Sequence, residues 1–182
     1  MKIGPFACSE MKSLARAKLP EKLDTIPEYL FYAEEVDGRF RGSPLKEVVM
    51  PKSCKVIEGS SFQILRNLEV CVLPEDLEVV GIASFYGCGK LKMTLPSSIK
   101  YIGGHAFRLT QSPVNQTIWD NLQLQPASFY GAKGWKHLSI PERITTIPDE
   151  CFAACSKFFE FASRFISTTY VLNSRKMSTW IL

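Results

Sequence analysis

The sequence predicts a mainly β repeat solenoid, and three observations support this fold class. Apolar residues make up 46% of the 182-residue chain, which is enough for a continuous core. The pentapeptide ASFYG occurs at 83–87 and again at 127–131. Proline recurs at single or double steps of about 22–23 residues, at Pro51, Pro74, Pro96 and Pro141. A period of this length is typical of small structural units that stack on one another.

Counted from its proline, each unit repeats the same apolar positions. The unit that begins at Pro74 has Leu77 three residues on, Val80 six on and Phe85 eleven on. Side chains that recur at one place in every unit are expected to face the core. We therefore expect the phenylalanines at the eleventh place to form an internal ladder. This ladder consists of Phe62, Phe85, Phe107, Phe129 and Phe152.

Glycine follows the sixth-place apolar residue in two units, as Gly81 and Gly103. Glycine lacks a Cβ and is used where a side chain would hinder a turn of the backbone. We expect such a turn at both glycines. Pro27 and Pro148 stand at the same place in two other units, where the turn must differ.

The repeat is irregular in two places. The spacing from Pro20 to Pro51 is about eight residues too long, and a surface-loop insertion is predicted near 34–44, where Gly, Pro and charged residues gather. A degenerate unit is predicted near 112–134, with Ile118 in the place of proline. The register continues back to the amino terminus, so the chain opens in mid-repeat. That start fits a fragment of a longer array or a short cap.

The pattern covers residues 1–160 in six to seven units. Residues 161–182 leave the pattern and are rich in apolar side chains. Because terminal units usually need a polar outer face, this segment is expected to be a C-terminal cap over the last unit or a docking tail.

The residues before each proline alternate in the manner of a short strand, as in Cys71, Val72 and Leu73. Proline ends such a strand because it has no N–H to donate to a ladder. A unit of about 22–23 residues cannot bury its apolar face alone. Stacked units are therefore expected to form a parallel sheet over one shared core.

Together these positions make the motif L-x-x-I-x-I-P-x-x-V-x-x-I-G-x-x-A-F-x-x-C-x-x-L. The best copy is LEVCVLPEDLEVVGIASFYGCGKL, at 68–91. The motif resembles the BspA-type leucine-rich repeat over about residues 3–160. The resemblance implies a right-handed superhelix with the parallel sheet on its concave side. It also implies a non-enzymatic protein-protein interaction module, with surface adhesion as one role.

The stretch at 81–90 superficially suggests a phosphate-binding loop. Such a loop needs G-x-x-x-x-G-K followed by Ser or Thr. Here Leu91 follows Lys90, and Ser84 stands where the first glycine belongs. We interpret the stretch as repeat architecture.

The cysteines and histidines do not form a catalytic or metal-binding pattern. All six cysteines fall at inward positions, where cysteine behaves as a small apolar residue. They are Cys8, Cys54, Cys71, Cys88, Cys151 and Cys155. No second pair or nearby histidine completes four zinc ligands around the last two, and His105 and His137 lie in different units. We predict no enzyme activity, no cofactor and no metal.

The outward residues of the strands before the prolines form the predicted partner-binding face. They are Val49, Val70, Val72, Lys92, Thr94, His137 and Ser139. This mixture of apolar and polar groups suits a protein partner better than a polyanion, and it equally fits a sheet face without a partner. The alternative function is a structural subunit, built permanently into a larger multiprotein assembly through its edges and C-terminal tail.

Composition narrows the remaining classes of partner. The net charge is +4 with Lys and Arg scattered along the chain, so nucleic acid is not indicated. The sequence contains no run of eighteen apolar residues, so no transmembrane segment is predicted. The start of the chain has no apolar core of signal-peptide type, which favours an intracellular location over the cell surface.

Overall fold

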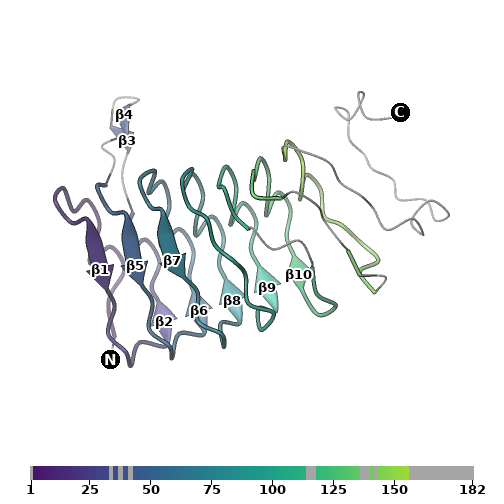
Figure 1. The fold of residues 1–182 in the computed structure, drawn as a ribbon, viewed down its shortest axis with the longest axis horizontal. Helices are drawn as coiled ribbons and strands as arrows, with labels where there is room; N and C mark the ends of the chain where they lie inside the picture. The colour runs from purple at the N-terminus through teal and green to yellow at the C-terminus, as the bar shows by residue number, and fades with distance from the viewer. Residues whose placement is uncertain are drawn as a thin grey trace.

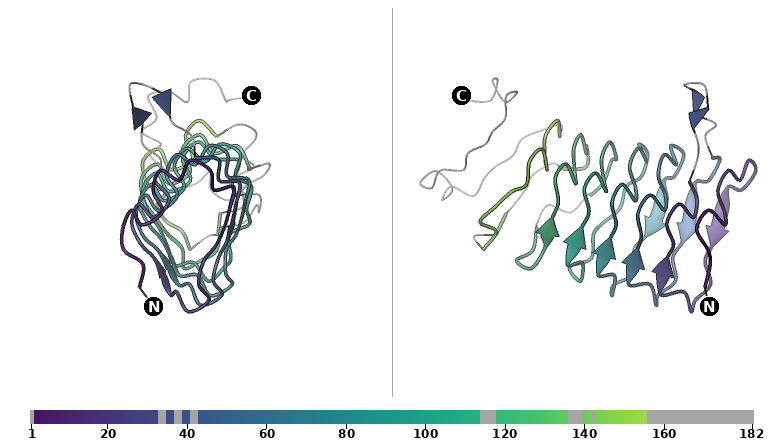
Figure 2. Two further views of the ribbon diagram at one scale, coloured as in Figure 1. Left: turned by 90° about the vertical axis from the view of Figure 1, so that its left-hand side faces the viewer. Right: turned by 180° about the vertical axis from the view of Figure 1, so that it is seen from behind.

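The computed structural model is an elongated stack of similar coils (Figure 1). Seen along the stack, the coils superpose around a common interior (Figure 2). The structure describes residues 2–32, 35–36, 39–40, 43–113, 118–135, 140–141 and 143–155. The predicted mainly β repeat solenoid is thus the observed fold, while the predicted tail at 161–182 lies outside the described residues.

The strands that precede the prolines form the predicted parallel sheet. It contains β1 (Arg16–Lys18), β5 (Glu47–Val49) and β7 (Val70–Val72), in the order β1-β5-β7. Each strand ends two residues before the proline of its unit. The middle residue of β5 and β7 is buried, and the residues on either side of it point outward.

A second parallel sheet lies across the core from the first, and the sequence analysis did not separate the two. Its strands have only two residues each and follow the order β10-β9-β8-β6-β2. The strands are β2 (Thr25–Ile26), β6 (Val56–Ile57), β8 (Val79–Val80), β9 (Tyr101–Ile102) and β10 (Gln123–Leu124). In the first four strands the second residue is the sixth-place apolar side chain, and it is fully buried.

The insertion contains a small antiparallel hairpin. Its strands are β3 (Glu35–Val36) and β4 (Arg39–Phe40), with Glu35 paired to Phe40. The hairpin projects from the edge of the solenoid at which the chain passes from the second sheet back to the first (Figure 1). We call this the turn edge.

The phenylalanine ladder is confirmed and runs through the core of the stack. Successive ring centroids from Phe62 to Phe152 lie 4.9, 5.5, 5.4 and 5.5 Å apart, with planes within 8° of parallel. Phe31 extends the ladder by one ring at 5.6 Å. Trp135 packs edge-on against both Phe129 and Phe152. Offset stacking of this kind adds to the stabilisation that burial provides.

Backbone hydrogen bonds join neighbouring coils along the ladder. From Phe31 to Phe129, the N–H of each ladder phenylalanine donates to the carbonyl of the residue that precedes the aromatic position in the next coil. Phe62 donates to Ser84 at 2.8 Å, and Phe85 to Ala106 at 2.9 Å. Beside the second sheet the bonds run the other way, from Gly81 N–H to Ile57 O at 2.7 Å. The peptide groups that form these bonds are therefore paired with those of neighbouring coils.

A Cβ would be hindered at Gly81 and Gly103, as predicted. Neither glycine has a left-handed φ, and the hindrance comes from the neighbouring coil. A Cβ on Gly81 would lie 2.6 Å from the carbonyl carbon of Glu58, and one on Gly103 would lie 2.6 Å from the amide nitrogen of Ile82. The backbones of adjacent coils approach too closely here for a side chain.

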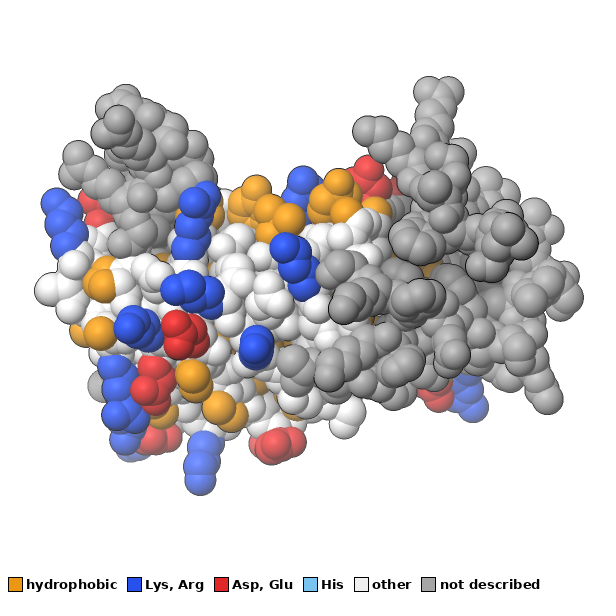
Figure 3. All heavy atoms as spheres, turned by 45° about the horizontal axis from the view of Figure 1, so that its top comes forward, with side chains coloured by type: hydrophobic (Ala, Val, Ile, Leu, Met, Phe, Trp, Pro, Cys, Tyr) orange, Lys and Arg blue, Asp and Glu red, His pale blue; other side chains and the backbone are white. Residues whose placement is uncertain are grey.

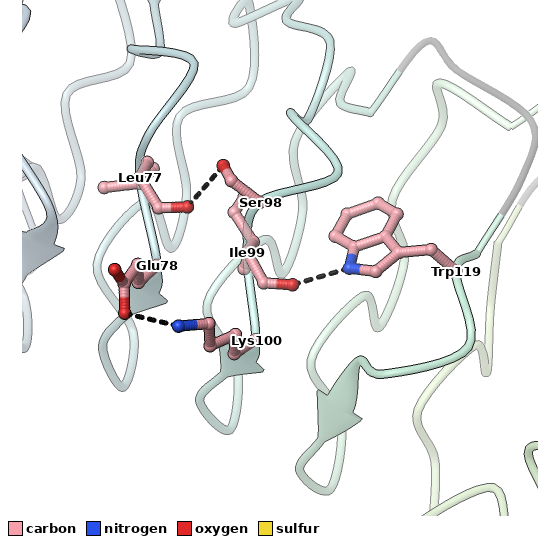
Figure 4. Close-up of polar contacts among 6 residues, drawn as sticks. All are labelled: Leu77, Glu78, Ser98, Ile99, Lys100 and Trp119. Atoms are coloured by element: carbon pink, nitrogen blue, oxygen red, sulfur yellow. Dashed lines mark hydrogen bonds and ion pairs between the residues drawn. The ribbon is translucent and has the colours of Figure 1, made fainter.

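Side chains at the edge opposite the turn edge also connect the coils (Figure 4). The Ser98 hydroxyl donates to the Leu77 carbonyl of the preceding coil at 2.7 Å. In the degenerate unit the indole N–H of Trp119 donates to Ile99 O at 2.5 Å. Trp119 thus provides a hydrogen bond between the degenerate unit, which lacks the proline, and the coil before it.

Candidate protein-binding surfaces

The cysteines are part of the core. The thiols of Cys88 and Cys155 each donate to the carbonyl of the preceding coil's phenylalanine at 3.0 Å, which accounts for cysteine at this repeat position. Burial raises the pKa of Cys54 to about 11, and that of Cys71 and Cys151 to about 12. Because the thiolate is the reactive form, these groups are poor nucleophiles at neutral pH.

The stretch at 81–90 has the repeat geometry. Ser84 and Cys88 are fully buried, and Gly87 takes a left-handed φ of 74°. Lys90 lies 4.0 Å from a carboxylate oxygen of Glu69. In the described ranges, no three His, Cys, Asp or Glu side chains are grouped so that they could hold a metal ion.

His105 is exposed, and its Nδ1 lies 3.3 Å from a guanidinium nitrogen of Arg108. His137 lies outside the described residues. The geometry around His105 is that of a surface contact between two side chains three residues apart.

The structure brings together five of the seven residues predicted to bind a partner. The parallel register sets Val49 beside Val72 and Glu47 beside Val70. The next coil continues the face, since Lys92 N–H bonds to Glu69 O at 3.5 Å. Lys92 and Thr94 are exposed there. His137 and Ser139 lie outside the described residues and stay predictions.

We call the outward surface of β1, β5, β7 and residues 92–94 the strand face. Val72 is 74% exposed and Val70 46% exposed, at the middle of this surface. The N-terminal part carries an ion pair of 3.1 Å between Arg16 and Glu47, with the arginine side chain 68% exposed. Exposed ion pairs of this kind are weak, so the paired side chains remain available for contact with a partner.

A second surface lies on the turn edge and was missed by the sequence analysis. It is a groove of about 310 Å³ with walls that include Ile64, Tyr86 and Leu109. Its residues are far apart in the sequence and meet only when successive coils are aligned. The alternation of aliphatic residues and glycine at the thirteenth place of the unit is the signal that could have revealed it.

The stacked parallel coils, the internal phenylalanine ladder and the exposed strand face define a leucine-rich-repeat solenoid. A family model described as "BspA type Leucine rich repeat region" matches residues 1–37 and 36–159, with six copies of the repeat. The chain belongs to this family. The family is generally a non-enzymatic interaction fold, which supports a module that binds other proteins.

The solved structures that resemble the chain include two leucine-rich repeat proteins. A leucine-rich repeat protein of T. pallidum aligns with a TM-score of 0.58 and 23% identity, over 87% of this chain and 61% of that one. A leucine-rich repeat protein from Bacteroides ovatus aligns with a TM-score of 0.44 and 21% identity, over 87% and 58% of the two chains. The chain therefore spans about three fifths of their length.

A comparison with curated proteins found no match. Within the ranges that the structure describes, no helix has the length and apolar character needed to cross a membrane.

Proposed function

We propose that the chain is a non-enzymatic module that binds a protein partner through its strand face. The observation that carries this proposal is the pair of exposed valines, Val70 and Val72, fixed in one parallel strand. Val49 lies beside Val72 in the register and is half-buried, which widens the apolar centre. An apolar centre with polar and charged residues around it is the usual anatomy of a protein interface.

The second sheet is less suited to this role. Its outward residues Val56, Val79 and Tyr101 are only partly exposed. Beside them Lys100 and Glu78 form an ion pair of 2.8 Å (Figure 4). Much of the apolar surface on this side is therefore already covered by the chain itself, whereas Val72 is 74% exposed.

Affinity capture from the native source, followed by mass spectrometry, tests the proposal. The wild type is compared with a variant that carries Val72→Glu and Thr94→Glu. Both changes place a carboxylate on the strand face at exposed positions, so folding is preserved. The matched control is Ile82→Glu, which changes an exposed aliphatic residue (60% exposed) that lies outside the strand face.

The expected result is a partner captured by the wild type and the control and lost with the strand-face variant. Capture that persists with all three proteins would contradict the proposal. In that outcome the contact would lie on the edges or the C-terminal tail, and a structural subunit of a larger assembly would be the better description.

A further inference from the structure

A groove on the turn edge is formed by the residues at the thirteenth place of the repeat. These residues stack one above another because Ile64 N–H bonds to Tyr86 O at 2.7 Å and Gly87 N–H bonds to Arg108 O at 2.9 Å. Leu109 is the next in the row. Glycine therefore stands between two aliphatic residues, and the missing side chain of Gly87 leaves a gap.

The gap is lined mainly by apolar groups. Ile64 forms one wall and is 9% exposed, while Leu109 on the other side is 46% exposed. Half-buried Tyr86 contributes to the lining, together with Gly87 and Gly89. The groove of about 310 Å³ has room for one large apolar side chain.

Basic side chains predominate around this groove, and the ion pair between Lys90 and Glu69, at 4.0 Å, is exposed and therefore weak. The four turn-edge segments, 62–67, 85–90, 107–112 and 129–134, contain no Asp or Glu. Their cations are Arg66, Lys90, Arg108 and Lys133. Figure 3 shows apolar side chains gathered along this edge with basic side chains beside them. A predominance of positive charge beside an apolar groove attracts a ligand of the opposite sign.

We propose that the turn-edge groove binds a protein segment in which a large apolar side chain is flanked by Asp or Glu. The apolar side chain enters between Ile64 and Leu109, and the flanking carboxylates meet Arg66 and Lys90. This site goes beyond the proposed strand-face function, because it lies on a different side of the coil and binds an acidic, apolar segment.

The observations favour a peptide over a nucleic acid. The guanidinium of Arg108 lies 4.2 Å from the ring centroid of Tyr130, so one face of that ring is already covered. Arg108 also lies 6.0 Å from the ring centroid of Tyr86. Single-stranded nucleic acids bind to open aromatic faces, whereas this groove offers aliphatic walls.

Selection from a random-peptide display library tests the proposal. The bait is the full chain, and enriched peptides are then measured with fluorescein labels by anisotropy. We expect enriched peptides to share a large apolar residue with Asp or Glu within two positions. The double variant Arg66→Glu/Lys90→Glu should weaken their binding on the order of tenfold or more, and raised salt should weaken binding to the wild type.

Three further variants identify the site that the peptides use. Leu109→Glu changes an exposed wall residue and should reduce binding through loss of the apolar contact. Lys52→Glu reverses one positive charge at an exposed residue of another turn and should leave binding unchanged. Val72→Glu should also leave binding unchanged, so the outcome is separate from that for the strand face.

Several outcomes would overturn the proposal. These are a selection with no enriched peptide, enriched peptides without an acidic bias, and equal binding by the Arg66→Glu/Lys90→Glu variant. Tight binding of a labelled oligothymidylate that displaces the peptides would assign the edge to nucleic acid instead. Loss of peptide binding in Val72→Glu alone would place the peptide on the strand face.

Discussion

Substitution of Gly81 by alanine tests the close approach of neighbouring coils. The added Cβ would lie 2.6 Å from the carbonyl carbon of Glu58 and 2.9 Å from the carbonyl oxygen of Ile57. Carbon atoms in contact are normally about 3.5–4.0 Å apart, so the new atom is about 1 Å too close to a backbone that cannot rotate away. The two coils must therefore separate.

Separation weakens the 2.7 Å bond from Gly81 N–H to Ile57 O. Overpacking costs typically about 1–3 kcal/mol, and loss of a buried hydrogen bond about 1 kcal/mol more. We expect Gly81→Ala to lower the free energy of unfolding by about 3 kcal/mol in total. Urea unfolding at 25 °C, followed by circular dichroism, measures this value.

Two other glycines provide matched controls for the same change. Gly87→Ala should cost about 1 kcal/mol, because its φ is +74° while its Cβ would make only ordinary contacts of 3.6 Å. Gly4→Ala should stay within about 0.5 kcal/mol of the wild type, since no atom lies within 4 Å of the new Cβ. Equal stability of the Gly81 and Gly4 variants would refute the close-approach explanation.

Three further predictions concern the core. Phe85→Ala removes a fully buried ring with a stacked neighbour on each side and should cost about 3–5 kcal/mol in the same urea assay; a smaller loss than 2 kcal/mol would mean that the ladder relaxes around the gap. Burial raises the pKa of Cys71 and Cys151 from 9.0 to about 12, so unfolding releases these thiol protons above pH 9. Stability is therefore fully present below pH 9 and should fall as the pH rises from about 9 towards 12, and a Cys71→Ala/Cys151→Ala variant should show a flatter pH dependence of the melting temperature. Trp119→Phe keeps a ring but loses the hydrogen bond to Ile99 O, which should cost about 1 kcal/mol, and an unchanged urea midpoint would show that water replaces the indole.

The features that the sequence predicted best are those that repeat in every unit. Phe85 and its counterparts recur at one offset, and stacking of equivalent positions is the only arrangement that buries all of them. The first parallel sheet was predicted because three-residue strands such as β7 show alternation before a proline. The thiol of Cys88 was predicted to point inward because it stands at a repeat position whose side chains face the core.

The features that escaped prediction depend on distances between coils. The strands of the second sheet, such as Val79–Val80, have two residues and are too short to show alternation. The role of Gly81 depends on the separation of two backbones, which periodicity does not report. The turn-edge groove depends on the neighbours of Gly87 in the coils before and after it, so no single unit contains its signal.

The hydrogen bonds along the phenylalanine ladder have an electrical consequence. From Cys8 to Phe129, the backbone N–H groups at the eleventh place of each unit all donate to a carbonyl of the following coil, at 2.8–3.0 Å. Peptide dipoles that point the same way add head to tail. This column therefore carries partial negative charge at its first coil and partial positive charge at its last, which is the reverse of the sense in an α-helix. Hydrogen bonds beside the second sheet, such as that from Gly81 N–H to Ile57 O, point the other way and offset part of this charge separation.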